Sequence, residues 1–203
     1  MVRRFSGSKL LVATHNAGKL DEVADLLADF RIEVVSAGQL GLPEPPETED
    51  SFIGNARIKA HAAAGATGLP SLADDSGLCV ESLGGEPGVR TADWAEGPGG
   101  RCFQRAMERT WAAMEGIGTN HPRRAEFRSA LVLAWPDGHD EVFEGSAPGS
   151  LIWPPRGALG HGYDPMFVPD GYDVTFGEMD RWEKNRLSHR YRAFRQLADN
   201  CFT

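Results

Sequence analysis

The stretch LLVATHNAGKLDEV (residues 10–23) decides the fold class, because it joins a buried strand to a helix through a short polar turn. Its apolar run ends at Ala13, and from Leu20 onward apolar residues recur at helical spacing. Asn16 is a residue type that often precedes the first turn of a helix, where its side chain accepts a backbone N–H. The pattern predicts a strand–turn–helix, the opening unit of an α/β protein.

The same turn carries Lys19 in its first helical turn, where a cation opposes the helix dipole. An anion bound at the helix N-terminus would remove this conflict, and Thr14 adds a hydroxyl at the strand end. The spacing is not that of a P-loop, which requires G-x-x-x-x-G-K-[ST]. The alternative is an ordinary capped helix with an exposed lysine, so the turn alone does not establish an anion site.

Outward from this turn, strand and helix patterns alternate along the chain. We expect strands at 32–35, 72–81, 124–135 and 141–143, helices at 51–66 and 101–114, and a closing helix to about residue 200. Turn residues at 74–77 interrupt the second of these strands, and the PDG sequence at 136–138 predicts a hairpin. The early strand–helix–strand order favours parallel pairing, so the fold class is mixed α/β. With no linker visible, we expect one domain over residues 1–203.

The composition limits the class of partner. The 203 residues carry a formal net charge of -8 and are 41% hydrophobic, which fits a globular fold and shows no basic excess for a nucleic-acid polymer. The apolar runs are far shorter than a membrane span, and the first residues lack the apolar core of a signal peptide. Three cysteines without a CxxC pair favour a reducing compartment over disulfides or structural zinc, so we expect a cytoplasmic protein.

Lysine is rare in this chain, which has four lysines and 17 arginines, so each lysine is a position to consider. Lys59 lies in the helix predicted at 51–66, on the same stripe as Phe52, Ala56 and Ala63. It is therefore surrounded by apolar side chains. Such a lysine either reaches past its apolar neighbours to solvent or directs its ammonium into a site.

The segment LADDSGL (residues 72–78) places Asp74 and Asp75 after a short apolar strand. Ligand sites in open α/β sheets lie at strand ends, and carboxylates with water and substrate phosphates suit Mg²⁺. Because adjacent strand residues point to opposite faces, we expect one aspartate to face a site and the other to support it. The alternative is an Asx-turn, which explains one aspartate better than two. Carboxylates of a Pro-rich loop could add a metal ligand or simply be solvated: Glu44, Glu47, Glu49 and Asp50.

Two later segments also carry polar side chains. GHGYDPMF (residues 160–167) offers an aromatic ring and a carboxylate, which suit either a flat heterocycle or an ordinary surface turn. In EKNRLSHR (residues 183–190), Lys184 and His189 would lie ~140° apart on one continuous helix. A helix that begins at Ser188 would instead place His189 and Arg190 at its N-terminus, where they and the preceding lysine could converge on an acceptor-rich group. The alternative is surface charge.

Six short motifs follow one another along the chain. They are T-x-N-x-x-K at 14–19, P-E-T at 46–48, N-A-x-x-K-A at 55–60, A-D-D-S-G-L at 73–78, G-Y-D-P-x-F at 162–167 and E-K-N-x-x-S-H-R at 183–190. In this order the chain resembles the inosine/xanthosine triphosphate pyrophosphatases. Each motif is weak by itself, but six in order over residues 10–197 are highly specific. Two positions depart from the family pattern, with His161 in place of an aromatic residue and Gly54 in place of a glutamate.

The resemblance implies a mixed α/β fold with an elongated central sheet flanked by helices, a cleft between two lobes, and a homodimer. It implies that the chain hydrolyses deaminated purine nucleoside triphosphates (ITP, dITP and XTP) to the monophosphate and pyrophosphate, which cleanses the nucleotide pool. Mg²⁺ would assist the attack of water on the α-phosphate. The partner is then a small molecule, and neither a nucleic-acid polymer nor a membrane is expected.

The matching positions carry the family's roles onto this chain. The triphosphate would bind at Thr14, His15, Asn16, Ala17, Gly18 and Lys19. Lys59 would join Lys19 in neutralising phosphate charge, and Ser76 would contact the substrate. Asp75 would be the general base and would bind the metal together with Glu47, with Asp74 as a further candidate ligand. The nucleoside would be recognised by His161, Gly162, Tyr163, Asp164, Lys184, His189 and Arg190.

Base recognition and catalysis separate this interpretation from two others. Hypoxanthine and xanthine present a 6-oxo acceptor where adenine has an amino donor, so Lys184 and Arg190 would favour the oxo bases. One alternative is a related pyrophosphatase that acts on other modified bases, which the segment at 183–190 disfavours. The other is a nucleotide sensor that binds without hydrolysis, which the presence of Asp75 and Glu47 disfavours.

Overall fold

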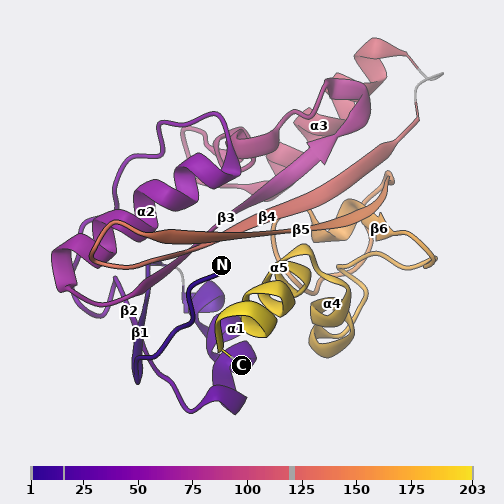
Figure 1. Cartoon of the computed structure of the whole chain (residues 1–203). Coiled ribbons are helices and arrows are strands. Elements are labelled where there is room, and N and C mark those ends of the chain that lie inside the picture. The colour runs from indigo at the N-terminus through magenta and orange to yellow at the C-terminus, as the bar shows by residue number, and fades with distance from the viewer. Residues whose placement is uncertain (1, 16, 119–121, 203) are drawn as a thin grey trace. The chain divides into compact units, whose positions relative to one another are not determined.

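Within the described residues, six strands form one sheet in the order β2-β1-β3-β4-β5-β6 (Figure 1). The structure is a computed structural model that describes residues 2–15, 17–118 and 122–202. The strands are β1 (Lys9–Val12), β2 (Glu33–Ser36), β3 (Ser71–Val80), β4 (Arg124–Ala134), β5 (Asp140–Leu151) and β6 (Phe167–Pro169). The α-helices are α1 (Ala17–Leu27), α2 (Phe52–Thr67), α3 (Phe103–Ile117), α4 (Arg181–Leu187) and α5 (His189–Leu197).

The sheet contains both kinds of strand pairing. β1 pairs in parallel with β2 and with β3, whereas β5 pairs antiparallel with β6. Neighbouring strands β4 and β5 are joined by a short turn, in which the N–H of Trp135 donates to the carbonyl of His139 at 2.9 Å. A connection this short joins antiparallel strands. The predicted mixed α/β class and the hairpin at 136–138 are therefore confirmed.

The chain forms two compact units, and each is described by itself. The first unit comprises Met1–Asp75, Ser129–Gly145 and Arg190–Thr203, and the second comprises Ser76–Arg128 and Ser146–His189. Strands β3, β4 and β5 contribute residues to both units. The cleft between two lobes stays a prediction.

In the first unit, helices cover both faces of the sheet, with α2 on one face and α1 and α5 on the other (Figure 1). The face toward α1 and α5 is rich in leucine and contributes Leu10, Leu72, Leu131 and Leu133 to a core with Val23, Leu27, Phe194 and Leu197. The face toward α2 carries smaller side chains, which are Ala73, Val132 and Ala134 against Ala56, Ala60 and Ala64. Successive residues of β3 and β4 thus alternate between the two faces. This alternation also sets the direction of the two aspartates that follow Ala73.

Helix α2 begins and ends where its sequence predicts. The hydroxyl of Ser51 accepts the N–H of Gly54 at 3.1 Å, which caps the first turn. Gly68 ends the helix with a φ of 70°, a left-handed conformation that a glycine adopts without steric cost. Between these caps, the alanine stripe allows the helix to lie close to the sheet, and Lys59 lies on that buried stripe.

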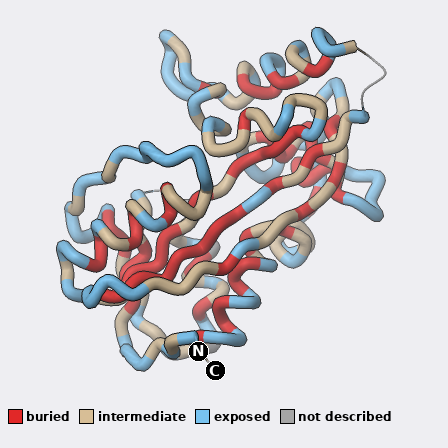
Figure 2. The backbone as a smooth tube through the Cα atoms, turned by 45° about the horizontal axis from the view of Figure 1, so that its top comes forward, coloured by how far each residue is buried: buried red, intermediate tan, exposed pale blue. Residues whose placement is uncertain are grey.

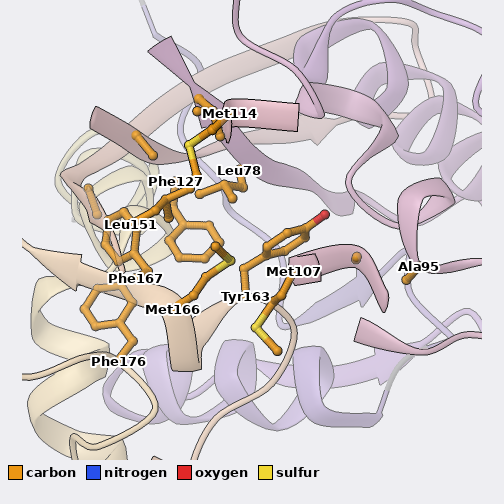
Figure 3. Close-up of a cluster of buried hydrophobic side chains, with 14 of the residues drawn as sticks. Leu78, Ala95, Met107, Met114, Phe127, Leu151, Tyr163, Met166, Phe167 and Phe176 are labelled. Carbon is orange, nitrogen blue, oxygen red and sulfur yellow. The ribbon is translucent and has the colours of Figure 1, made fainter. Parts of the chain in front are cut away.

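The second unit has a core of aromatic and sulfur-containing side chains (Figure 3). The rings of Phe127 and Phe167 lie 4.7 Å apart, and Phe176 packs 5.0 Å from Phe167. Met107, Met114 and Met166 fill the space around them, together with Tyr163. Because Phe127 and Phe167 lie on β4 and β6 while Phe176 lies in the loop before α4, this core ties that loop to the sheet. Figure 2 shows that long stretches of the strands are buried.

Two sequence predictions of local structure are wrong. The turn at 74–77 is absent, since β3 runs without interruption from Ser71 to Val80. Pairing along both edges of β3 satisfies its backbone and outweighs the turn preference of Asp, Ser and Gly. β5 is longer than the predicted 141–143. The predicted helix start at Ser188 is confirmed, since Ser188 is extended at φ -68° and ψ 152° and α5 begins at His189. None of the helices in the part of the chain described here is long and apolar enough to cross a membrane.

Candidate functional site

In the first unit, three residues predicted to bind phosphate or metal lie together: Lys59 of α2, Asp75 of β3 and Glu47 of the Pro-rich loop. Asp75 faces α2, and its Oδ1 lies 3.1 Å from Nζ of Lys59. The same ammonium donates to Oε1 of Glu47 at 2.6 Å. Both the Lys59 and Asp75 side chains are buried, whereas that of Glu47 is 39% exposed. Lys59 therefore links Asp75 to the Pro-rich loop that carries Glu47.

The Asp75 carboxyl group has a raised pKa and one unsatisfied oxygen. Burial raises the pKa of its carboxyl group to about 6, and the carboxylates of Glu47 and Asp74 add to this effect while Lys59 opposes it. Its second oxygen, Oδ2, is buried and has no hydrogen-bond partner among the residues that the structure describes. A buried acceptor of this kind is suited to a water molecule or a cation.

The ammonium of Lys59 is held in its charged form. Burial acts to lower its pKa, but the carboxylates of Asp75 and Glu47 outweigh burial and raise it. Of the two interpretations of Lys59 from the sequence, the structure shows the second, with the ammonium directed at carboxylates and away from bulk solvent.

Asp74 faces the opposite side of the sheet, as strand alternation predicts. Its Oδ2 accepts from Nζ of Lys19 at 2.9 Å and from a guanidinium nitrogen of Arg190 at 3.1 Å. Burial acts to raise the pKa of Asp74, but Arg190 and Lys19 outweigh it and hold the pKa well below the usual range. Asp74 is thus an ionised acceptor that gathers two cations from α1 and α5.

Ser129 is a member of this cluster that the sequence motifs do not include. It lies on β4, is 2% exposed, and its hydroxyl donates to Oδ1 of Asp74 at 2.6 Å. Its signal in the sequence is a polar residue on a strand of otherwise apolar positions, SALVLA at 129–134. That signal does not identify the partner, because β3 and β4 are far apart along the chain.

The structure describes only part of the turn at 14–19. Thr14 lies two residues after the end of β1, and its carbonyl accepts the N–H of Gly38 at 3.3 Å. Nε2 of His15 donates to the carbonyl of Leu42 at 2.7 Å, so the turn is tied to the start of the Pro-rich loop. Asn16 lies outside the described residues. Ala17 and Gly18 begin the helix α1, which also carries Lys19.

The Pro-rich loop is anchored at its other end by α2. Oδ1 of Asn55 accepts the backbone N–H of Glu49 at 3.0 Å, and Asn55 is 2% exposed. With the Lys59–Glu47 contact, this bond fixes the segment that carries Glu47. The motif N-A-x-x-K-A therefore supplies two anchors for the loop from one face of the helix.

In the second unit, Asp164 is the centre of the predicted nucleoside residues. Its Oδ2 accepts from Nζ of Lys184 at 2.6 Å and from the N–H of His161 at 2.8 Å. The carboxylate is 4% exposed. Gly160, with a φ of 72°, allows this close approach, because a Cβ there would overlap Oδ2 of Asp164. The structure therefore brings together the two segments that the sequence treats as separate motifs.

Other predicted residues of this unit lie in or against its core. The ring of Tyr163 is 1% exposed, and its hydroxyl lies 3.5 Å from that of Thr110 (Figure 3). The imidazole of His189 stacks on Phe127, with the ring centroids 5.2 Å apart. Gly162 has a φ of 69°, and Ser76 is half-buried on β3. Contact of these residues with a nucleoside stays a prediction.

The predicted charged residues thus form two clusters, one in each unit, and the members of the first lie on both faces of the sheet. Among the described residues, no three His, Cys, Asp or Glu side chains are arranged to hold a metal ion. The first cluster combines cations with carboxylates and one unsatisfied carboxylate oxygen, a set suited to phosphate chemistry. The second presents a partly buried lysine paired with a buried aspartate beside a glycine-rich turn.

Comparisons with known proteins identify the family. A model of the Ham1 family matches residues 10–200. The chain is 64% identical over 202 residues to a dITP/XTP pyrophosphatase of Ruegeria pomeroyi, in a match that covers 100% of this chain and 99% of the relative. It is 54% identical over 200 residues to a dITP/XTP pyrophosphatase of Rhodospirillum centenum, with 98% of both chains covered.

Solved structures agree with this assignment. A HAM1 protein from Coxiella burnetii has a TM-score of 0.89 at 33% identity and covers 95% of this chain and 98% of its own. A nucleoside-triphosphatase, dITP/XTP pyrophosphatase, from Mycobacterium abscessus has a TM-score of 0.75 at 40% identity, with 93% and 98% covered. The family resemblance of the six motifs is confirmed, and the chain belongs to the Ham1 family.

Proposed function

We propose that this protein hydrolyses the deaminated purine nucleoside triphosphates ITP, dITP and XTP to the monophosphate and pyrophosphate. The observation that carries this proposal is the buried Asp75, whose Oδ1 contacts Lys59 while its Oδ2 has no hydrogen-bond partner in the described part of the chain. The names of the relatives in Ruegeria pomeroyi and Rhodospirillum centenum, both dITP/XTP pyrophosphatases, support the substrate class.

In this proposal Asp75 acts on the attacking water. In the proposed reaction, a water oxygen attacks the α-phosphorus, and the bond from that phosphorus to the bridging oxygen breaks, so that pyrophosphate leaves. Asp75 accepts the proton of the attacking water at its carboxylate group. Its pKa of about 6 leaves it mostly ionised at neutral pH and still basic enough to accept that proton.

The cations of the first unit would stabilise the charge on the phosphoryl groups, which is the main catalytic task in phosphoryl transfer. Three of them, however, are matched by three carboxylates of the same cluster: Lys19, Lys59 and Arg190 with Glu47, Asp74 and Asp75. When all six groups are ionised, their charges cancel. A triphosphate therefore needs additional positive charge, which a divalent cation would bring.

Mg²⁺ fits the residues of this cluster. It is usually held by one or two carboxylates together with water and substrate phosphates, and the unsatisfied Oδ2 of Asp75 is such a carboxylate oxygen. Asp75 and Glu47 would hold the ion, which when bound supplies charge stabilisation to the phosphoryl group. Metal binding by Asp74 stays a prediction, since its described contacts are with Lys19, Arg190 and Ser129.

Recognition of the base would come from the remaining predicted residues. Lys184 and Arg190 would donate to the 6-oxo group of hypoxanthine or xanthine, and the amino group of adenine would leave them without an acceptor. His161, Gly162, Tyr163, Asp164 and His189 would complete this site, and Thr14, His15, Asn16, Ala17, Gly18, Lys19 and Ser76 would hold the triphosphate. We further propose a single pyrophosphatase domain over residues 1–203, a homodimer, and a cytoplasmic location.

One experiment tests the proposed activity. The protein is incubated with Mg²⁺ and ITP, dITP, XTP, GTP, ATP or dUTP, and pyrophosphate and orthophosphate are measured separately. We expect pyrophosphate from the three deaminated purines, little from ATP, and loss of activity in EDTA that Mg²⁺ restores. Preference for dUTP would support an enzyme for other bases, and binding of ITP without any pyrophosphate would support a sensor.

A further inference from the structure

Ser129 contacts one oxygen of the Asp74 carboxylate, and two cations contact the other oxygen. Its hydroxyl donates to Oδ1 at 2.6 Å, while Lys19 and Arg190 both contact Oδ2, at 2.9 and 3.1 Å. The three donors come from β4, α1 and α5, which are separate elements of the first unit. Ser129 contacts neither cation in these bonds and acts on them only through the carboxylate.

The position of Ser129 follows from the pleat of β4. Ser129, Leu131 and Leu133 point to the face covered by α1 and α5, and Asp74 points to the same face from β3. Asp75, one residue on, points toward α2 and out of reach of the hydroxyl. A serine at this position can therefore orient one aspartate of the pair without touching the other.

A contact of this kind fixes the orientation of the Asp74 carboxylate about its terminal torsion. The terminal torsion of an aspartate is broad, so its backbone does not determine which way each oxygen points. A short hydrogen bond to an ionised carboxylate is among the strong ones in proteins, and it fixes Oδ1 toward β4. Oδ2 is then held toward α1 and α5, where Lys19 and Arg190 meet it.

We propose that Ser129 is a positioning residue for phosphate binding, which orients Asp74 so that the Lys19 ammonium is held in place for the triphosphate. This inference rests on the proposed function, because it takes Lys19 as a phosphate-binding residue. A serine that merely satisfies a buried polar group would affect folding stability alone. A positioning serine also affects phosphate affinity, and it does so only while Lys19 is present.

The test is a double-mutant cycle between two residues that do not touch. Ser129→Ala, Lys19→Met and the double variant are titrated with inorganic tripolyphosphate and Mg²⁺ by calorimetry, which requires neither a base nor turnover. Ser129→Ala should weaken tripolyphosphate binding about tenfold in the wild-type background, the effect of losing a hydrogen bond to a charged group. In the Lys19→Met background the same substitution should change affinity less than about twofold.

Ser71→Ala is the matched control. Ser71 lies on β3, is fully buried in the first unit, and its hydroxyl has no hydrogen-bond partner among the described residues. Its removal should leave tripolyphosphate affinity unchanged. A second pair, Ser129→Thr and Ser129→Val, separates shape from chemistry, because these side chains are nearly isosteric and only threonine keeps the hydroxyl. Threonine should retain more affinity than valine.

An equal loss of affinity from Ser129→Ala in both backgrounds would overturn the inference, as would equal affinities of the threonine and valine variants. Failure of the wild-type protein to bind tripolyphosphate would overturn it as well. The proposed function fails differently, by the absence of pyrophosphate from ITP and XTP in a protein that still binds tripolyphosphate. In steady-state kinetics, Ser129→Ala should raise KM for ITP more than it lowers kcat.

Discussion

Nζ of Lys59 lies 3.1 Å from Oδ1 of Asp75, with both side chains buried between α2 and β3. This pair gives the carboxylate a fixed direction and leaves its second oxygen available. It also explains why the two residues occur in separate motifs of the sequence. One lies on the inward stripe of a helix and the other on the facing side of a strand.

Removal of the ammonium should destabilise the fold. Lys59→Met leaves the buried Asp75 carboxylate without its cation, and breaking a buried pair in this way costs about 3 kcal/mol of unfolding free energy. Urea denaturation at pH 7 measures the loss. Lys9→Met is the control, since the Lys9–Glu33 pair is largely exposed and is worth less than about 1 kcal/mol. Equal losses in the two variants would show that the Lys59–Asp75 pair contributes no more than a surface contact.

Asp75→Asn should separate binding from turnover. The amide keeps the size of the side chain but accepts no proton from water, so pyrophosphate release from ITP should fall about 10²–10⁴-fold. Calorimetric titration with tripolyphosphate should still show binding through the cations. The exposed Asp173 provides the comparison, because Asp173→Asn should retain full activity. An Asp75→Asn variant with normal turnover would remove this residue from its role as the base.

Lys184 should determine preference for the oxo bases. Lys184→Met removes the donor held by Asp164 at 2.6 Å and should lower kcat/KM for ITP about 10–100-fold, with a much smaller change for ATP. Arg186, exposed on the same helix, offers the control substitution Arg186→Met. Equal losses for ITP and ATP would mean that Lys184 supports the fold or the phosphates and does not recognise the base.

The contacts of Asp140 predict a pH dependence of stability. Burial acts to raise its pKa, but hydrogen bonds from Arg57 and His61 of α2 outweigh burial and lower it. The stabilising contribution is therefore present above the unfolded-state pKa of about 3.9 and is lost as the pH falls through the lower, folded-state value.

Asp140→Asn tests this contribution. At pH 7 the variant should lose up to about 1 kcal/mol of unfolding free energy, because the contacts are partly exposed. The difference from wild type should shrink as the pH falls below about 4, in urea titrations across that range. A difference that stays constant with pH would assign the loss to packing.

His15 should restrain the Pro-rich loop. Its bond to the carbonyl of Leu42 ties the loop over a cavity of ≈ 110 Å³, lined mainly by Leu42, Pro43, Pro45 and several alanines. Because the loop borders this cavity, His15→Ala should speed amide hydrogen exchange at Glu44 and Glu47 several-fold. His15→Gln keeps an N–H donor and should restore part of the protection. Unchanged exchange in His15→Ala would show that the loop is held by its Lys59 and Asn55 contacts.

Much of this protein could be predicted from local sequence patterns, because short-range rules determine them. The extent of helix α2, the buried stripe with Lys59, and the opposite directions of Asp74 and Asp75 all follow from helical and strand periodicity. The mixed α/β class follows from the same periodicities together with the turn at 136–138.

Only the tertiary structure decided which partners these side chains have. The turn residues at 74–77 predict a break in the strand, yet pairing on both sides of β3 keeps its backbone extended. Ser129 meets Asp74 across two strands that lie 55 positions apart along the chain, and Arg190 meets it from 116 positions away. The sequence by itself determined which residue types lie on which face of each element. The sheet and its packed helices decided which of those faces meet, since such contacts depend on strand order and not on the neighbouring residues.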